Sequence, residues 1–216
     1  MQLSFLSSGF NPTLALLIIM SEDVRKSWED FLNPDVMKQR LITASIYLAA
    51  YEFLVDSITG RILEFFTDGF SNGEFTVSPK YAAEVLSKNK SPVYASLEWL
   101  QEHGVIVEDD LKSFEQVKAC RNFLAHELTA VISGQSKADI ASNFPVMVTL
   151  LRKIEVWWVV NVEMATNPDF DDAEVDETGI IPGPVWTLQL LLEVALGEPD
   201  KAAYYLNEFR KAGAKP

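Results

Sequence analysis

The residues from Asn33 to Phe66, NPDVMKQRLITASIYLAAYEFLVDSITGRILEFF, carry the clearest structural pattern in the chain. Asn33 followed by Pro34 is a typical helix start, because asparagine caps the first turn and proline fits its first position. The large apolar residues beyond it recur at steps of three and four: Tyr47, Tyr51, Leu54, Ile58, Ile62 and Phe65. This spacing places them on one face, so it predicts a single long amphipathic helix, which Gly60 can bend.

Helical patterns also dominate the rest of the chain, and strand patterns are nearly absent. Further helices are expected at about 79–88, 92–103, 109–133, 143–165, 186–196 and 201–211. Gly104 is well placed to end the helix at 92–103, and Asp109 or Asp110 to cap the next one. Residues 70–76 (FSNGEFT) are expected to form a loop. The sequence therefore predicts an all-α, up-and-down helical bundle with a small C-terminal helical appendage.

Composition divides the chain into four segments. Residues 1–20 form an N-terminal segment that we expect to lie upstream of the natural start, at Met20 rather than Met1, with a signal peptide as the weaker alternative. We expect a helical domain at 21–166, an exposed acidic linker at 167–184 and a helical pair at 185–213 that packs back on the bundle. The apolar run at the N-terminus is too short and interrupted for a membrane span, so no membrane partner is expected.

The net charge of −13 bears on the kind of partner the chain can bind. Nucleic-acid binding depends on Lys and Arg that neutralise phosphates, so this charge argues against a general nucleic-acid coat. The charge is uneven, however. Residues 167–177 hold six acids and no base, whereas residues 80–126 hold six bases against seven acids. A small cationic site within the second stretch therefore stays compatible with the composition.

Several kinds of site can be set aside. Cys120 is the one cysteine in the sequence, so it cannot form an internal disulfide, and a reducing, cytoplasmic location is expected. The sequence has no zinc-ligand spacing, phosphate-binding Gly-rich loop or nucleophile elbow, so it predicts neither a metal nor a cofactor. His103 precedes Gly104 at an expected helix end, where a structural role is favoured. His126 is then the candidate for histidine chemistry.

His126 lies in the run Cys120-Arg-Asn-Phe-Leu-Ala-His-Glu-Leu128, expected to be the middle of a helix. At about 100° per residue, Arg121 falls at the edge of the apolar stripe, while Asn122 and His126 lie one turn apart on a polar face. Neither Arg121 nor His126 has an acid three or four positions away on its own helix. A helix edge with these side chains and no local acid suits an anion.

The chemistry that fits Arg121, Asn122 and His126 is transesterification of an RNA phosphodiester. A ribose 2′-hydroxyl attacks its own phosphate, so neither a metal nor an enzymic nucleophile is required. The imidazole can act as general base or acid near neutral pH, and the guanidinium can neutralise charge on the phosphoryl oxygens. The amide can hold the histidine or the substrate. A twofold dimer with two such helices side by side would double these groups.

The run Arg121-Asn122-Phe-Leu-Ala-His126 resembles the Rx4-6H signature of the HEPN superfamily, in which an arginine, a polar residue and a histidine lie on one helix of an α-helical bundle. The resemblance covers about residues 21–165. It implies a metal-independent endoribonuclease that acts on RNA as a homodimer with a composite site. Arg121 and His126 would be catalytic and Asn122 would assist. Such proteins often serve as toxins, antiphage defence effectors or RNA-processing factors, so an antitoxin or a defence-system protein is a further expected partner.

Two residues near the run qualify this reading. HEPN toxins that are paired with a nucleotidyltransferase antitoxin usually have a tyrosine two positions after the histidine, whereas this chain has Leu128. That pairing is therefore in doubt. Lys118 lies one turn before Arg121 and Asn122 and could add a substrate phosphate contact, although an ordinary exposed lysine is equally compatible with the pattern.

A second interpretation is a non-catalytic helical interaction module, such as an accessory subunit of a defence or RNA-processing complex. The negative charge and the C-terminal helices, which resemble no family, favour it.

Three further features are expected to be structural. Glu52 is expected to be solvated or salt-bridged, and Cys120 to be a core residue. Trp157 and Trp158 are expected in the core or a dimer interface in preference to a base-stacking surface.

Overall fold

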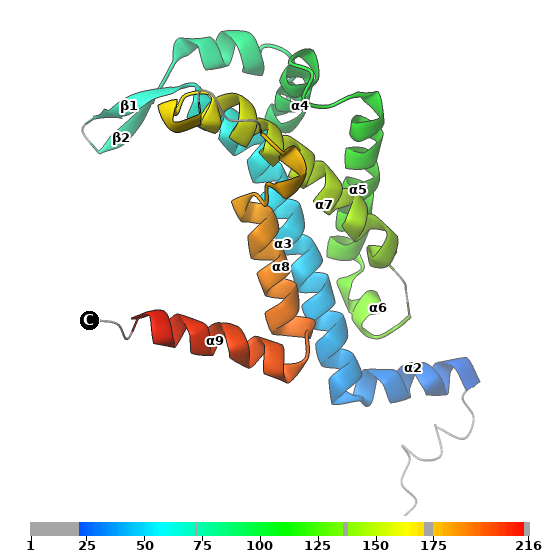
Figure 1. Ribbon diagram of the computed structural model, residues 1–216. Helices are drawn as coiled ribbons and strands as arrows, with labels where there is room; N and C mark the ends of the chain where they lie inside the picture. The colour runs from blue at the N-terminus through cyan, green and yellow to red at the C-terminus, as the bar shows by residue number, and fades with distance from the viewer. Residues whose placement is uncertain (1–21, 72, 136–137, 171–174, 214–216) are drawn as a thin grey trace, which may run out of the picture.

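The computed structural model describes residues 22–71, 73–135, 138–170 and 175–213, and it is an all-α bundle with one small hairpin (Figure 1). The fold class predicted from sequence is confirmed. The N-terminal segment at 1–20 and part of the acidic linker, residues 171–174, lie outside the described residues.

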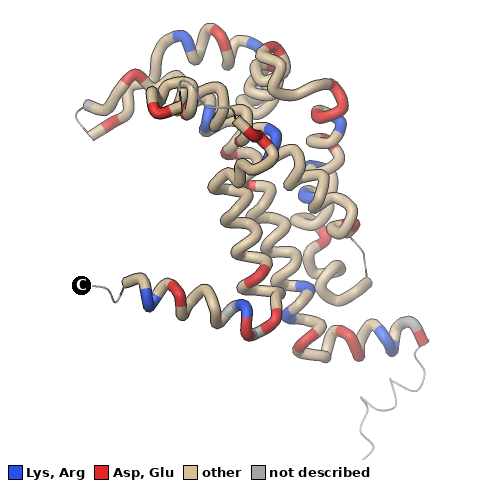
Figure 2. The backbone as a smooth tube through the Cα atoms, viewed as in Figure 1, with Lys and Arg blue, Asp and Glu red and all other residues tan. Residues whose placement is uncertain are grey.

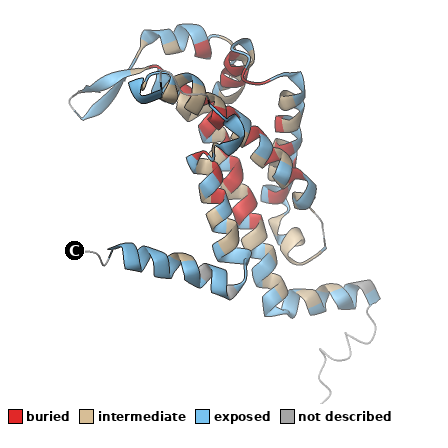
Figure 3. Ribbon diagram, in the orientation of Figure 1, coloured by how far each residue is buried: buried red, intermediate tan, exposed pale blue. Residues whose placement is uncertain are grey.

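Helix α3 (Pro34–Phe65) is the central element, as the sequence predicted. The Asn33 side chain accepts hydrogen bonds from the backbone N–H groups of Asp35 and Val36, at 3.0 and 3.4 Å. The helix continues through Gly60 without interruption. It packs against α4 (Pro92–Glu102), α5 (Glu108–His126) and α7 (Ile140–Trp158). Figure 3 shows that the buried residues lie along the faces these helices turn toward one another.

The end of the bundle beyond α3 departs from the predicted pattern. Residues expected to form a loop belong to an antiparallel hairpin, β1 (Thr67–Ser71) and β2 (Glu74–Val77). Gly73 in its turn has φ of +86°, a conformation that glycine adopts without steric cost. The helix expected at 79–88 contains a π-helical turn, η1 (Tyr81–Leu86). A second π-helical turn, η2 (Val159–Met164), extends α7.

The helix expected to run from Asp109 or Asp110 to Ser133 is divided in two, which corrects the prediction. α5 begins earlier, with Val107 at its N-cap, and the Asp110 carboxylate accepts the Val107 N–H at 2.8 Å. It ends at His126, and α6 (Leu128–Ile132) follows after Glu127. The change of direction lets Leu128 and Val131 pack on the core beside α3. Gly104 and Gly134, at φ of +69° and +75°, end their helices as expected.

The helix that sequence predicted at 143–165 begins earlier, at Ile140. Asp139 is the N-cap, and its carboxylate accepts the Ser142 N–H at 3.3 Å. Pro145 therefore lies inside α7 and does not open it. Tertiary packing of α7 on α3 and α5 holds the helix on both sides of this proline.

The C-terminal segment divides into an attached and a projecting helix. α8 (Gly183–Leu196) packs against α3 and α7, whereas α9 (Pro199–Gly213) packs chiefly on α8 and points away from the bundle (Figure 1). The prediction that both helices pack back is therefore right for α8 and wrong for α9. The end of the predicted linker is also fixed, because Arg152 of α7 donates to the carbonyls of Glu177, Thr178 and Ile180.

Two described segments are long and apolar enough to cross a membrane when judged by length and composition alone, Pro34–Phe65 and Glu177–Leu196. The most apolar window is 44% buried in the first and 17% buried in the second. Core helices of soluble proteins pass the same test, and α3 is the central helix of this bundle. α8 itself has 14 residues. It would span roughly 21 Å at 1.5 Å per residue, less than the hydrocarbon core of about 30 Å. Figure 2 shows how few charges α8 carries.

Candidate functional site

The structure places Arg121, Asn122 and His126 on the last two turns of α5. Arg121 lies at the edge of the core, beside Tyr51 of α3, and its side chain is 36% exposed. Asn122 is half-buried and His126 is exposed. At about 100° per residue, Arg121 and His126 are roughly 140° apart around the helix, with Asn122 between them, so the three side chains are neighbours around α5 and do not share one face. His126 is the final residue of α5 and does not lie in the middle of a helix.

Arg121 has no acid three or four positions away on its own helix, but it contacts an acid on another helix. Its Nη2 lies 3.4 Å from Oε1 of Glu52 on α3, whose side chain is 65% exposed. Its Nη1 lies 3.4 Å from Oδ1 of Asn122, and the guanidinium sits 5.3 Å from the ring centroid of Tyr51. The Arg121 Nε is buried and has no hydrogen-bond partner among the described residues. Both hydrogen bonds are long, so the guanidinium is only loosely held.

Lys118, the predicted additional substrate contact, is engaged within the chain. Its ammonium group lies 4.5 Å from the ring centroid of Tyr94 and donates to the Tyr94 hydroxyl, which in turn donates to Glu115. This hydrogen bond with Tyr94 raises the pKa of Lys118, so the side chain stays protonated at neutral pH. Lys118 supplies positive charge beside Arg121 but is less free to move toward a substrate than an unpaired lysine.

The five main cavities of the described part of the chain are lined by other residues, and none of these five borders Arg121, Asn122 or His126. The depression that borders α5 lies next to Cys120 and Asn143. In one copy of the chain, these side chains form an open ridge. An open ridge can bind a phosphate by charge, but it cannot exclude water or surround a reacting group without a second surface.

Other residues singled out from the sequence have structural settings. His103 caps α4, with its Nδ1 2.8 Å from the carbonyl oxygen of Trp99 and its ring stacked on that indole at 3.8 Å between centroids. Cys120 is buried, and burial raises the pKa of its thiol. Trp158 is in the core, as expected, whereas Trp157 is half-buried at the surface.

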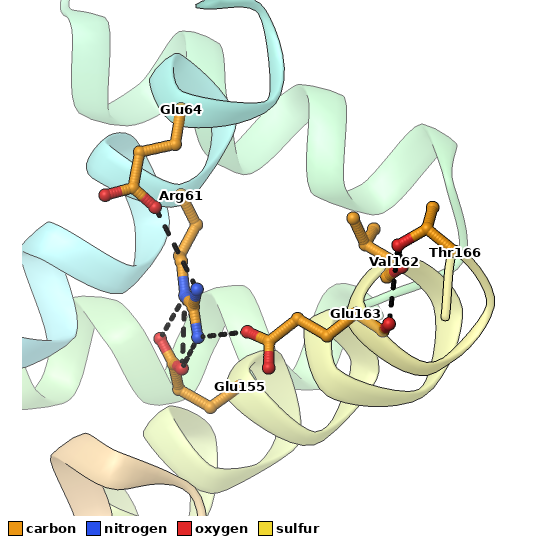
Figure 4. Close-up of polar contacts among 6 residues, drawn as sticks. All are labelled: Arg61, Glu64, Glu155, Val162, Glu163 and Thr166. Atoms are coloured by element: carbon orange, nitrogen blue, oxygen red, sulfur yellow. Dashed lines mark hydrogen bonds and ion pairs between the residues drawn. The ribbon is translucent and has the colours of Figure 1, made fainter. Parts of the chain in front are cut away.

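Sequence reasoning missed a partly buried ion cluster that joins α3 to α7 and η2, drawn in Figure 4. Arg61 contacts Oε2 of Glu155 at 2.8 Å and Oε1 of Glu163 at 3.0 Å, and Glu64 lies 3.9 Å away. The Glu155 side chain is only 1% exposed, and its hydrogen bond raises the pKa of Arg61. In the sequence, only the three-residue spacing of Arg61 and Glu64 within α3 indicates an ion pair, because Glu155 lies 94 positions from Arg61.

Within the described residues, no group of three or more His, Cys, Asp or Glu side chains is arranged to hold a metal ion. No protein-family model, curated protein or solved structure matches the chain significantly.

Proposed function

We propose that the chain is a metal-independent endoribonuclease of the HEPN type, whose active site forms when two copies meet along α5. The observation that supports this most is the position of Arg121, Asn122 and His126 within the last two turns of α5, where a guanidinium, an amide and an imidazole are neighbours at the edge of the bundle. Glu52 is the one acid in contact with Arg121 in the described part of the chain, and it is exposed at a distance of 3.4 Å. An incoming phosphate can displace so weak a pair.

The surface around the ridge suits close approach of a second helix. Ala125 is exposed beside Asn122. Phe123 is 39% exposed and, together with the exposed Ala119, lines the shallow depression that adjoins the ridge on α5. Small side chains allow two helices to approach, and an exposed aromatic residue adds apolar area to an interface. In a twofold pair, the two ridges would form opposite walls of one cleft, which a single copy lacks.

The proposed reaction uses side chains alone. His126 of one copy removes the proton from a ribose 2′-hydroxyl, and the oxygen attacks the adjacent phosphorus. Arg121 neutralises the charge that grows on the phosphoryl oxygens, and the 5′-oxygen leaves after it is protonated by the second imidazole. Asn122 orients Arg121 through the contact at 3.4 Å. The products are a 2′,3′-cyclic phosphate and a 5′-hydroxyl end.

The test is cleavage of single-stranded RNA by the purified chain in the presence of EDTA. We expect cyclic phosphate ends and a loss of roughly 10²- to 10⁴-fold in rate for His126→Ala, the usual contribution of a general base. Arg121→Ala should lose activity similarly. His103→Ala is the matched control, since it removes the other histidine of the sequence at a site that does not border the ridge. Wild-type cleavage by His126→Ala would falsify the proposal.

Growth of cells that express the chain gives a second readout. If the chain acts as a toxin or an antiphage effector, induced expression should arrest growth, and the His126→Ala variant should not.

A non-catalytic interaction module is the alternative function. It is favoured by large apolar side chains exposed on the outer helices, such as Trp28 on α2 (Glu22–Leu32) and Phe209 on α9. This alternative predicts partner binding that is unchanged in the Arg121→Ala/His126→Ala variant, and no RNA cleavage by the wild type.

A further inference from the structure

A cavity of about 490 Å³ opens at the end of the bundle opposite α6, next to β1, η1, α4 and η2. This volume is within the range of small-molecule sites. Arg121 and His126 do not line the cavity, and they lie at the far end of α5 from it. A ligand in this cavity would therefore bind at a place separate from the proposed nuclease site.

Both π-helical turns of the described chain border this cavity. η1 contributes Glu84, and η2 contributes Asn161 and Val162. π-Helical turns are rare and often occur at functional sites, because the extra residue widens the helix and redirects side chains. Two of them on opposite walls of one cavity indicate that its shape is built into the fold.

Aromatic rings form the walls. Trp99 stacks between the ring of His103, at 3.8 Å, and the ring of Trp158, at 6.0 Å between centroids. Trp157 meets Trp99 edge to face at 6.4 Å. Phe65 lines the cavity and is 53% exposed. The negative faces of Trp and Phe rings attract cations.

The polar groups of the cavity are mainly hydrogen-bond acceptors. Asp68 and Glu84 are exposed and form no ion pair with other described residues. The Asn161 amide donates to the Trp157 carbonyl at 3.0 Å, so its Oδ1 is left to accept. A neutral His103 that donates from Nδ1 to the Trp99 carbonyl likewise has Nε2 as an acceptor. Lys80 supplies the one ammonium group in the lining.

The charged groups near the cavity, like its acceptor atoms, favour a positively charged ligand. The adjoining Arg61 cluster sets one positive charge against the carboxylates of Glu64, Glu155 and Glu163. Together with Asp68 and Glu84, these acids outnumber Arg61 and Lys80 around the cavity, so the local field favours a cation. We propose that the cavity binds a small organic ammonium ion, a di- or polyamine, with ammonium groups at Asp68 and Glu84 and the alkyl chain along Phe65 and Trp157.

The experiment titrates the full chain with spermidine at constant ionic strength, using calorimetry together with tryptophan fluorescence. The variant is Asp68→Asn/Glu84→Gln, which removes two exposed charges while it retains the side-chain shapes. The control is Glu198→Gln/Asp200→Asn, which removes two exposed charges beside α9 at the other end of the molecule. Magnesium chloride and adenosine monophosphate serve as comparison ligands.

We expect saturable spermidine binding, a rise in Kd of at least about tenfold in Asp68→Asn/Glu84→Gln, and wild-type affinity in the control. Equal weakening in both variants, or equal binding of magnesium, would show attraction by net charge alone and overturn the site. Saturable binding of the nucleotide in place of spermidine, or no spermidine binding, would overturn it as well. RNA cleavage is not a readout here, so failure of this proposal and failure of the nuclease proposal can be distinguished.

Discussion

Arg61 is a polar residue whose removal should lower stability strongly, because it neutralises Glu155 in the core. Arg61→Ala leaves the Glu155 carboxylate, at 1% exposure, without its cation. We expect a loss of about 3 kcal/mol in the free energy of unfolding, typical of breaking one partner of a buried pair. Urea unfolding followed by circular dichroism measures it.

The control for Arg61 is Arg25→Ala, which breaks exposed pairs with Glu22 and Glu29 on α2 and should change stability little. The double variant Arg61→Met/Glu155→Met should recover much of the loss, since replacing both members of a buried pair by apolar residues is often neutral. If the double variant were as unstable as Arg61→Ala, the unpaired carboxylate would not be the cause.

At the scale of elements, Arg152 of α7 holds the segment before α8 against α7 through hydrogen bonds to the backbone of residues 177–180. Its Nη2 donates to the carbonyls of Glu177, Thr178 and Ile180, at 2.8, 3.2 and 3.2 Å. In Arg152→Ala we expect faster protease cleavage within 175–182 and faster hydrogen exchange in the first turn of α8, while the interior of α3 stays protected. Lys153→Ala is the control, because Lys153 pairs with Asp110 of α5 instead. Equal cleavage in the two variants would contradict this anchoring role.

Most elements that sequence predicted correctly have a buried face, and α9, which is exposed along most of its length, is the exception. In α3, the apolar spacing and the Asn33 cap together indicate the helix, and the structure confirms both. The hairpin was missed because Phe70 and Phe75 pair across it while both stay exposed, so the alternation between buried and exposed positions that marks a strand is absent. The break at Glu127 was missed because Leu128 continues the helical spacing, and contacts with α3 decide the change of direction.

The same distinction applies to the candidate site. Helical geometry alone predicts Arg121 at the edge of the apolar stripe and Asn122 and His126 on the neighbouring polar face. The interruption of an apolar helix by Glu52 indicates that this acid could face the motif, but the specific contacts between helices are not encoded in the local pattern. Glu52 lies 69 positions from Arg121, and Tyr94 lies 24 positions from Lys118. Such pairs follow from how α3, α4 and α5 pack, which no spacing within one helix encodes.

For the molecule as a whole, the composite site requires that two copies associate along α5. Phe123 is the exposed aromatic residue next to the ridge, so Phe123→Glu should place a carboxylate in the interface and raise the dimer dissociation constant by at least about tenfold. Sedimentation velocity over a range of concentrations measures this. RNA cleavage should fall in proportion to the remaining dimer.

Phe209→Glu is the matched control, because Phe209 is 79% exposed on the projecting helix α9, far from the ridge. If association depends on α5, Phe209→Glu leaves both the dimer and the cleavage rate unchanged. The opposite result, a dimer lost in Phe209→Glu and intact in Phe123→Glu, would assign the apolar outer helices as the interface. The two ridges would then have no shared cleft, and Arg121 and His126 would have to act within a single copy, where none of the five main cavities of the described residues borders them.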